Sequence, residues 1–379
     1  MRVLDLSRLI PGPFGTLVLA DLGAQVDKLE DAGAGDYLRH LPPQRGGCSL
    51  GFQLLNRGKR SATVDLKNPL GREAFLRLLA RYDVLVEQFR PGVLARLGLG
   101  HDALLAKYPG LIVCALTGYG QTGPLAARAG HDLNYLARGG LLASQGPAGA
   151  PPTVPGFQLA DVSGGMWCAI AILAALRERD QGGGGRVLDI AMADGVLGFA
   201  PLSLAAALAG TEAERGRDTL TGGIAPYRTY LAKDGVALTL AALEPKFWMA
   251  FSAAVGIEPD PLALVPGPHQ AALMQRIEQV FASRTGAEWE AFSAQHDCCV
   301  EPVIAASALM TDEHARARGL VYEIEVDGER VPQLRTPVTM RELEAPPAPR
   351  PGEHTDAIFR EAGFGDDEIA ELRRTRAIA

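Results

Sequence analysis

Residues 2–30, RVLDLSRLIPGPFGTLVLADLGAQVDKLE, decide the fold of this chain. The run Arg2–Leu6 predicts a buried strand, and residues 13–22 have helical spacing after a Pro-Gly-Pro entrance. The run Gln25–Glu30 predicts a second strand. A strand, a helix and a strand in this order form a βαβ unit, which places the two strands side by side in a parallel sheet.

The same alternation continues through the N-terminal half of the chain. The segment 61–66 (SATVDL) is β-rich, and Asn68 followed by Pro69 is typical of an N-cap and a first helical residue. Two further strands are predicted at 83–89 (DVLVEQF) and 111–118 (LIVCALTG). We therefore predict an α/β fold, with a mostly parallel sheet that carries helices on its faces.

The chain changes character near residues 221–226 (TGGIAP). Before this point the sequence predicts a helix, a strand and a second helix at 164–177, 186–192 and 194–208. After it, Asp234-Gly235 and Asp327-Gly328 are typical of tight turns between antiparallel strands. We therefore predict a smaller α+β region that extends to about residue 330.

Composition and charge exclude several classes of protein. The 379 residues are 47% hydrophobic and 21% charged, with a net charge of −7 and no long basic run, which argues against nucleic acid as the main ligand. The five cysteines form no CxxC pair or disulfide framework, as expected in a reducing cytosol. The most apolar stretch, Val196–Ala209, is short for a bilayer and contains Pro201. We expect a soluble, cytoplasmic protein with no membrane partner.

Several standard catalytic and binding signatures are absent from the sequence. No GxGxxG follows the first strand, and GxxxxGK[ST], GxSxG and HExxH do not occur. Residues 182–185 (GGGG) precede a strand and are typical of a surface loop. The segment His296–Cys299 contains two adjacent cysteines, which cannot easily both bind one zinc ion together with His296. We predict no metal site and no nicotinamide or flavin site.

Three short segments carry residues suited to acid–base chemistry. Residues 118–124 (GYGQTGP) follow a predicted strand and lead to His131 in AGHDLNY, at the sheet edge where α/β proteins bind ligands. Asp161 in DVSGGM and Glu244 in LEPKFW each stand at the start of a predicted helix. Taken alone, His131 is more simply a capping or packed histidine, and the two acids are more simply N-cap residues.

These segments, together with Arg90–Val93 (RPGV) and residues 56–61 (NRGKRS), resemble the family III CoA-transferase superfamily, and within it most closely the α-methylacyl-CoA racemases. The resemblance extends from Pro11-Gly12-Pro13 to residues 352–355. AGHDLNYL is its most specific part, because the racemases pair this His with a downstream Asp. The transferases of the superfamily keep the Asp as a nucleophile and usually lack the His.

The resemblance implies a Rossmann-like large domain, a smaller α+β domain and an interlocked homodimer. The implied domains are 1–215 for the first part of the large domain, 225–330 for the small domain and 331–379 for a segment that returns to the large domain. The active site would lie between the large domain of one subunit and the small domain of the other. Glu244 would then belong to the partner's site.

The implied reaction is racemisation of a 2-methylacyl-CoA, an isomerase step in lipid metabolism, through an enolate. His131 and Asp161 would flank the carbon next to the thioester, and each would act as acid or base according to the direction. Glu244 beside Asp161 would raise the pKa of that acid, and Asp132 would orient His131. Helix N–H groups near His131 would bind the enolate oxygen. CoA is part of the substrate, so no cofactor is expected, and its binding residues would be Val64, Asp65, Leu66, Lys67, Arg90, Gly130 and Tyr135.

One position departs from the racemase pattern. The racemases place an Arg that helps to hold the CoA nucleotide just after the second strand, where this chain has Asp31. Either Arg39 or Arg45 replaces that contact, or the nucleotide is held differently. Two alternatives stay open: a CoA-transferase in which Asp161 attacks the thioester, and a non-catalytic acyl-CoA-binding relative.

Overall fold

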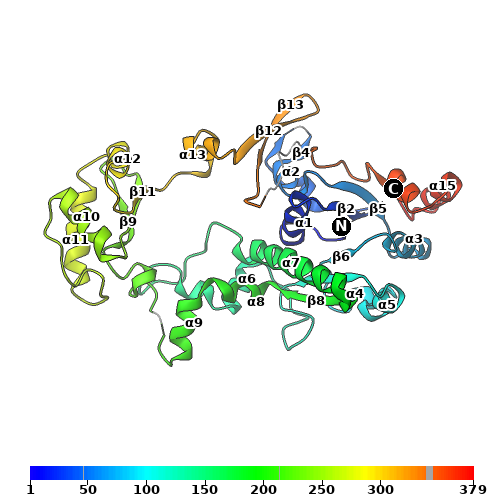
Figure 1. The fold of residues 1–379 in the computed structure, drawn as a ribbon, viewed down its shortest axis with the longest axis horizontal. Coiled ribbons are helices and arrows are strands. Elements are labelled where there is room, and N and C mark those ends of the chain that lie inside the picture. The colour runs from blue at the N-terminus through cyan, green and yellow to red at the C-terminus, as the bar shows by residue number, and fades with distance from the viewer. Residues whose placement is uncertain (46, 213, 339–344) are drawn as a thin grey trace. The chain divides into compact units, whose positions relative to one another are not determined.

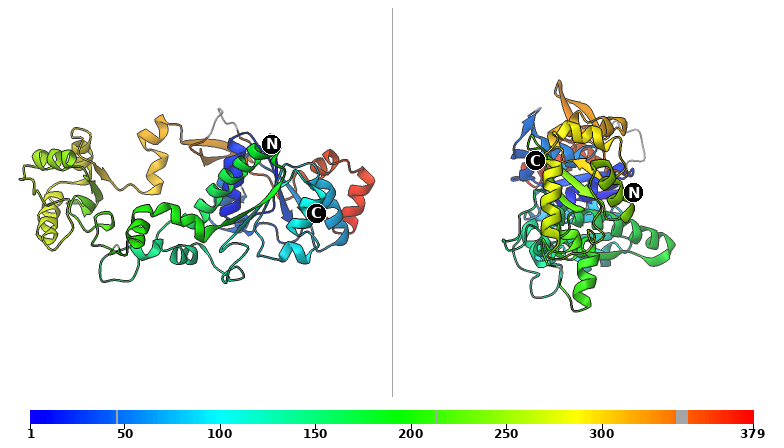
Figure 2. Two further views of the ribbon diagram at one scale, coloured as in Figure 1. Left: turned by 60° about the horizontal axis from the view of Figure 1, so that its bottom comes forward. Right: turned by 90° about the vertical axis from the view of Figure 1, so that its left-hand side faces the viewer.

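The computed structural model describes residues 1–45, 47–212, 214–338 and 345–379, and these form two compact units. Unit 1 consists of Met1–Leu136, Gln158–Val196 and Glu313–Ala379, and unit 2 consists of Ala137–Phe157 and Leu197–Asp312. Figures 1 and 2 show the course of the chain through both units.

Unit 1 is built on a six-stranded parallel sheet in the order β5-β2-β1-β6-β7-β8. The strands are β1 (Arg2–Asp5), β2 (Gln25–Asp31), β5 (Arg60–Val64), β6 (Val84–Glu87), β7 (Ile112–Thr117) and β8 (Arg186–Ala191). The strand order reverses between β1 and β6, as in dinucleotide-binding folds, and such sheets bind ligands beyond the carboxyl ends of the strands at this reversal. The predicted α/β fold with a parallel sheet is confirmed.

Helices cover both faces of this sheet. Those of unit 1 are α1 (Pro11–Asp21), α2 (Leu50–Asn56), α3 (Pro69–Leu79), α4 (Val93–Arg96), α5 (His101–Lys107), α6 (Asp132–Arg138, whose last two residues fall in unit 2), α7 (Leu159–Glu178), α8 (Met192–Gly195), α13 (Glu313–Ala317), α14 (Thr355–Glu361) and α15 (Asp366–Arg374). Asn68 caps α3 as predicted, because its side chain accepts a hydrogen bond from the Leu70 N–H at 3.0 Å.

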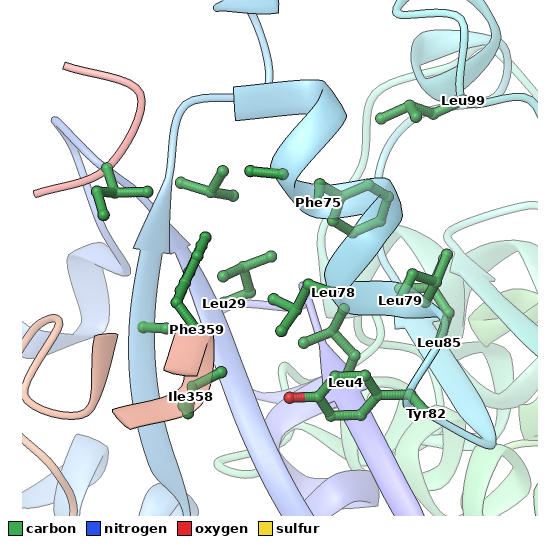
Figure 3. Close-up of a cluster of buried hydrophobic side chains, with 14 of the residues drawn as sticks. Leu4, Leu29, Phe75, Leu78, Leu79, Tyr82, Leu85, Leu99, Ile358 and Phe359 are labelled. Atoms are coloured by element: carbon green, nitrogen blue, oxygen red, sulfur yellow. The ribbon is translucent and has the colours of Figure 1, made fainter. Parts of the chain in front are cut away.

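The C-terminal segment packs on the first strands of the chain. Figure 3 shows Ile358 and Phe359 of α14 in one cluster of buried apolar side chains with Leu29 of β2 and Phe75 of α3. Both side chains are fully buried, and the backbone N–H of His354 donates to the Ser61 carbonyl at 2.8 Å. The core of unit 1 therefore joins the two ends of the chain.

The hairpin of β12 (Val321–Val326) and β13 (Glu329–Leu334) also belongs to unit 1. The Leu334 carbonyl accepts a hydrogen bond from Arg57 at 3.2 Å, which joins the hairpin to the chain just after α2. The sequence prediction assigned this hairpin, through residue 330, to the small domain. The Asp327-Gly328 turn indicates the hairpin in the sequence, but nothing in the sequence indicates that the hairpin packs on unit 1.

Unit 2 contains a three-stranded antiparallel sheet in the order β11-β10-β9. Its elements are α9 (Pro201–Leu208), β9 (Tyr227–Leu231), β10 (Ala237–Ala241), α10 (Pro245–Val255), α11 (Gln270–Phe281), α12 (Gly286–Ser293) and β11 (Val300–Pro302). Its core is aromatic, with Trp248, Phe251, Phe281 and Trp289 buried. The small domain was predicted to begin at 225, whereas unit 2 already includes residues 137–157 and 197–215.

The predicted helix 194–208 is broken in the structure. A short helix, α8, ends at Gly195, and a new one, α9, begins at Pro201. Proline has no N–H to donate and its ring clashes with the preceding turn, so it is tolerated in the first turn of a helix and not in the middle. The prediction of one continuous helix was therefore wrong.

One helical stretch of the described chain, Leu159–Gly183, is long and apolar enough to span a membrane, with a mean hydropathy of 1.8. It is not the stretch 196–209 that the sequence analysis considered most apolar. Half of the scored segment is buried in the protein, and α7 packs against α1 and the sheet strands β7 and β8. Burial of this kind is also typical of a core helix in a soluble protein.

Candidate active site

The carboxyl ends of β5, β2, β1 and β6 surround a cavity of about 460 Å³. The predicted CoA-binding residues Val64, Asp65, Leu66 and Lys67 line it where the chain leaves β5, and Arg90 lines it just after β6. These residues come from separate loops, and the strand order brings them to one edge of the sheet. Gly130 and Tyr135, also predicted to bind CoA, do not line this cavity.

Four cationic side chains face the cavity: Arg8, Lys67, Arg90 and Arg96. None of the four has an ion-pair partner among the residues that the structure describes. Arginine and lysine are the side chains that bind phosphate groups most readily, and here their charges are not neutralised by a carboxylate. The arrangement suits a polyanionic ligand such as the diphosphate of a nucleotide.

Arg8 and Arg96 are not among the binding residues that the sequence predicts, whereas Arg39 and Arg45 are its candidates to replace the contact missing at Asp31. Arg39 is buried and fully used, because it donates to both carboxylate oxygens of Glu30 at 2.8 and 2.6 Å and to the Pro349 carbonyl at 2.8 Å. Arg45 is half-exposed and lies 3.9 Å from Glu329, and neither arginine lines the cavity. Arg8 and Arg96 could have been found only by knowing that β1 and β6 are neighbours.

Buried charges hold the loop that follows β1, in place of a glycine-rich turn. The Lys28 ammonium donates to the Ser7 carbonyl at 2.7 Å and lies 3.0 Å from the Asp36 carboxylate. The Asp36 carboxylate also accepts the Leu9 N–H, and Leu9 has a left-handed φ of 63°. A leucine in this backbone region needs such support, since its Cβ crowds the carbonyl there. The loop thus presents Arg8 to the cavity from a rigid base.

Asp161 stands in the first turn of α7, which lies directly on α1. A Cβ on Gly165 would be 2.4 Å from the Pro11 carbonyl oxygen, and a Cβ on Gly15 would be 2.7 Å from the Gly165 carbonyl oxygen. Only glycines allow the two backbones to approach this closely. The contact between Gly165 of α7 and Gly15 of α1 therefore fixes where the first turn of α7, with Asp161, lies relative to α1.

Asp132, at the start of α6, caps α7 from outside. Its Oδ1 accepts hydrogen bonds from the Ala160 N–H at 2.7 Å and the Asp161 N–H at 3.1 Å. Burial raises the pKa of Asp161 to about 7, and the neighbouring Asp132 charge adds to this shift. The resemblance instead implies that Glu244 raises this pKa and that Asp132 orients His131. In the described part of the chain, the side-chain hydrogen bonds of Asp132 go to α7 and not to His131.

His131 lies immediately before α6, and its side chain is exposed. Its N–H donates to Asn134 Oδ1 at 3.1 Å, and its carbonyl accepts the Asn134 N–H at 2.8 Å. Since Asp132 is the next residue and binds the backbone of Asp161, the structure brings His131 and Asp161 to the same edge of the sheet. His131 is neither packed in the core nor bound through its ring in the described contacts.

Tyr135 fixes the loop that carries His131. Its hydroxyl donates to the Gly130 carbonyl, and its ring is so close to Gly118 and Gly130 that a Cβ on either would come within 2.7 Å of it. Burial, with the nearby Asp161 charge, raises the pKa of Tyr135 to about 12, and the Arg90 charge opposes the rise. Tyr135 thus lies within electrostatic range of both Asp161 and the cavity residue Arg90.

Glu244 belongs to unit 2. It stands at the N-cap position of α10, where its carbonyl accepts the Phe247 N–H at 3.0 Å. Its exposed carboxylate lies 3.1 Å from the Lys246 ammonium. Burial and the Asp132 charge raise the pKa of Asp161 in the single chain, and Glu244 takes no part in this. A role for Glu244 in the site stays a prediction.

The described residues contain no group of three or more His, Cys, Asp or Glu side chains that could hold a metal ion. Cys298 is buried, and burial raises the pKa of its thiol to about 11, so it is held in the neutral form. The side chains described at this edge of the sheet are acid–base groups, such as His131 and Asp161, and the cations of the cavity.

Known proteins are similar to this chain along most of its length. Residues 1–355 match the model of CoA-transferase family III. The α-methylacyl-CoA racemases of Mus musculus and Homo sapiens are 36% and 35% identical, with 100% of this chain and 96% of each relative covered. A succinyl-CoA–D-citramalate CoA-transferase of Chloroflexus aurantiacus is 32% identical, with coverage of 100% and 97%.

Solved structures with a similar fold are also found. A CAIB/BAIF family protein from Brucella suis superimposes with a TM-score of 0.81 at 32% identity, with 96% of this chain and 98% of that chain covered. The family model spans most of the chain, and the relatives match it from end to end. This chain is a member of CoA-transferase family III.

Proposed function

We propose that this enzyme racemises or epimerises 2-methylacyl-CoA thioesters by moving one proton through an enolate, with His131 and Asp161 as the two acid–base groups. The observation that carries the proposal is the pKa of Asp161, raised to about 7, in a chain segment tied to His131 through Asp132. A group that exchanges a proton in both directions works best when its pKa is near the working pH.

The proposed reaction requires a group on each face of the reacting carbon. One removes the weakly acidic proton next to the thioester, and the other returns a proton from the opposite side. Imidazole has a suitable pKa without help, whereas a carboxyl needs burial or a like charge, which Asp161 has. Proton transfer changes no oxidation state, so the proposal needs neither a metal nor a redox cofactor.

The binding part of the proposal places the CoA nucleotide in the cavity at the ends of β5, β2, β1 and β6. The cavity cations Arg8, Lys67, Arg90 and Arg96 would neutralise its diphosphate. The charges of Arg90 and Asp161 both act on Tyr135, which therefore lies between the cavity and the acid–base pair, and the pantetheine arm would run along this side.

A CoA-transferase is the second candidate, and its support is the similarity to transferases along the whole chain. In that reaction Asp161 attacks the thioester and must be ionised, which a raised pKa opposes at neutral pH. The two reactions differ in what they require: racemisation exchanges the α-proton with solvent and needs no second acid. Deuterium uptake from D₂O into a 2-methylacyl-CoA therefore tests the proposal.

Replacing Asp132 by Asn should lower the pKa of Asp161. Asn keeps an oxygen for the Ala160 and Asp161 N–H groups but removes the negative charge that favours the protonated acid. For the enantiomer that Asp161 deprotonates, kcat/KM rises as Asp161 ionises, so this rise should move to lower pH. Glu73→Gln, an exposed carboxylate on α3, is the control and should leave the profile unchanged. An unshifted profile in Asp132→Asn would contradict the role given to Asp132.

We also propose that the active enzyme is a homodimer. The outward face of α7 carries the exposed apolar side chains Met166, Trp167, Ile170 and Leu173, spaced along one side of the helix. A subunit contact would bury them. Sedimentation should give a dimer at assay concentration, and Ile170→Lys should weaken it. A stable, fully active monomer would remove this claim and, with it, the contribution of Glu244 from a partner.

A further inference from the structure

The charges in the nucleotide cavity are unevenly distributed. Arg8 follows β1, while Arg90 and Arg96 follow β6, so three cations lie on the β1–β6 side. On the other side, beyond β2 and β5, stand the carboxylates Asp31 and Asp65 with Lys67. A ligand that fills the cavity therefore meets concentrated positive charge at one end and mixed charge at the other.

Asp31 is the last residue of β2, and its carboxylate is held in place. Its Oδ1 accepts the Gly33 N–H at 2.9 Å and the Ala34 N–H at 2.8 Å. Asp31 is exposed and lines the cavity, and it has no cationic partner among the described residues. The preorganised carboxylate therefore offers its second oxygen to a ligand.

Two other acids near Asp31 line the cavity, but unlike Asp31 each has a cationic partner among the described residues. Glu30 is buried and bound by Arg39 at 2.6 Å, and Asp36 is buried and lies 3.0 Å from Lys28. Their charges are neutralised within the protein. Of the acids at this end of β2, Asp31 is thus the one whose negative charge acts on whatever enters the cavity.

In sheets of this topology, a carboxylate at the end of the second strand accepts hydrogen bonds from ribose hydroxyls, whereas an arginine nearby accommodates a phosphate on the ribose. Coenzyme A has a phosphate on its ribose 3′ oxygen, which an unpaired carboxylate repels. We propose that Asp31 determines nucleotide selectivity: it binds a ribose hydroxyl, so that the 3′-phosphate contributes little to affinity and 3′-dephospho-CoA is accepted nearly as well as CoA. This inference rests on the proposed placement of the CoA nucleotide in the cavity.

The test is titration calorimetry of the full-length protein with CoA and with 3′-dephospho-CoA. The wild-type dissociation constants should agree within about fivefold. Asp31→Arg exchanges a repelling charge for a phosphate-binding one, so it should favour CoA over 3′-dephospho-CoA by about tenfold or more. Asp65→Asn, the matched control, removes the other carboxylate of the same cavity and should change both affinities by a similar factor.

A wild-type preference for CoA above about fivefold would overturn the inference, as would an unchanged ratio in a folded Asp31→Arg protein. A ratio that responds to Asp65→Asn and not to Asp31→Arg would also overturn it, because selectivity would then belong to Asp65. If neither nucleotide binds the wild-type protein, the placement of CoA in this cavity fails as well. The racemase reaction is tested separately by deuterium exchange, so the two failures are distinguishable.

Discussion

Replacing either His131 or Asp161 by alanine is expected to lower the racemisation rate by about 10²–10⁴-fold, the usual contribution of one acid–base group. In the proposed mechanism each group serves one face of the enolate, so a proton removed on one face returns to the same face when the other group is missing. His131→Ala should still exchange the α-proton of one enantiomer, and Asp161→Ala that of the other. The measurement is deuterium incorporation into each enantiomer separately.

The same pair of variants separates the racemase from the transferase. A nucleophilic Asp161 would make Asp161→Ala inactive and leave His131→Ala nearly normal. A third variant, Asn134→Ala, removes the side-chain contact to the His131 N–H without touching either acid–base group and reports on loop position alone. Almost full racemase activity in His131→Ala would exclude the two-base mechanism.

Gly165→Ala should destabilise the protein by about 3 kcal/mol, at the upper end for an overpacked contact. The added Cβ would be 2.4 Å from the Pro11 carbonyl oxygen and 2.9 Å from the Gly15 nitrogen, and both are backbone atoms that cannot rotate away. Helices α1 and α7 would have to separate, and Asp161 lies one turn from the contact. We therefore expect a lower free energy of unfolding in denaturant titration, together with a fall in kcat.

Gly110→Ala is the control for this prediction. A Cβ on Gly110 meets no atom within 4 Å, and Gly110 is not among the left-handed glycines. Its unfolding free energy should stay within about 0.5 kcal/mol of the wild-type value. If Gly165→Ala were equally neutral, the close crossing of α1 and α7 would not be what positions Asp161.

The local features of the fold could be predicted because neighbouring residues decide them. The βαβ unit of residues 2–30 follows from hydrophobic periodicity, and the start of α3 at Pro69 follows from Asn68. Val64–Lys67 and Arg90, which the sequence predicts to bind one ligand, all line the same cavity, and their role in binding CoA stays a prediction. Their meeting at one cavity depends on the parallel sheet, which places the loops after successive strands at one edge.

Contacts between distant segments were not predictable from pattern. Asp132 accepts hydrogen bonds from backbone N–H groups 28 and 29 residues later in the chain. Nothing in the sequence around Asp132 indicates that it caps α7 and does not orient His131. Arg8 is a charged residue after a strand, indistinguishable in sequence from a solvated one. The division of the chain at 197 and 313 depends on which core each segment joins, and periodicity does not show that.

The proposed reaction removes and returns the proton next to a thioester. The most direct measurement is incubation of a single enantiomer of a 2-methylacyl-CoA with the enzyme in D₂O, with no other carboxylic acid present, followed by chiral analysis and mass spectrometry. We expect deuterium at the α-carbon and progress toward a mixture of both enantiomers. Retention of configuration with no deuterium uptake, and CoA transfer only after a free acid is added, would contradict it.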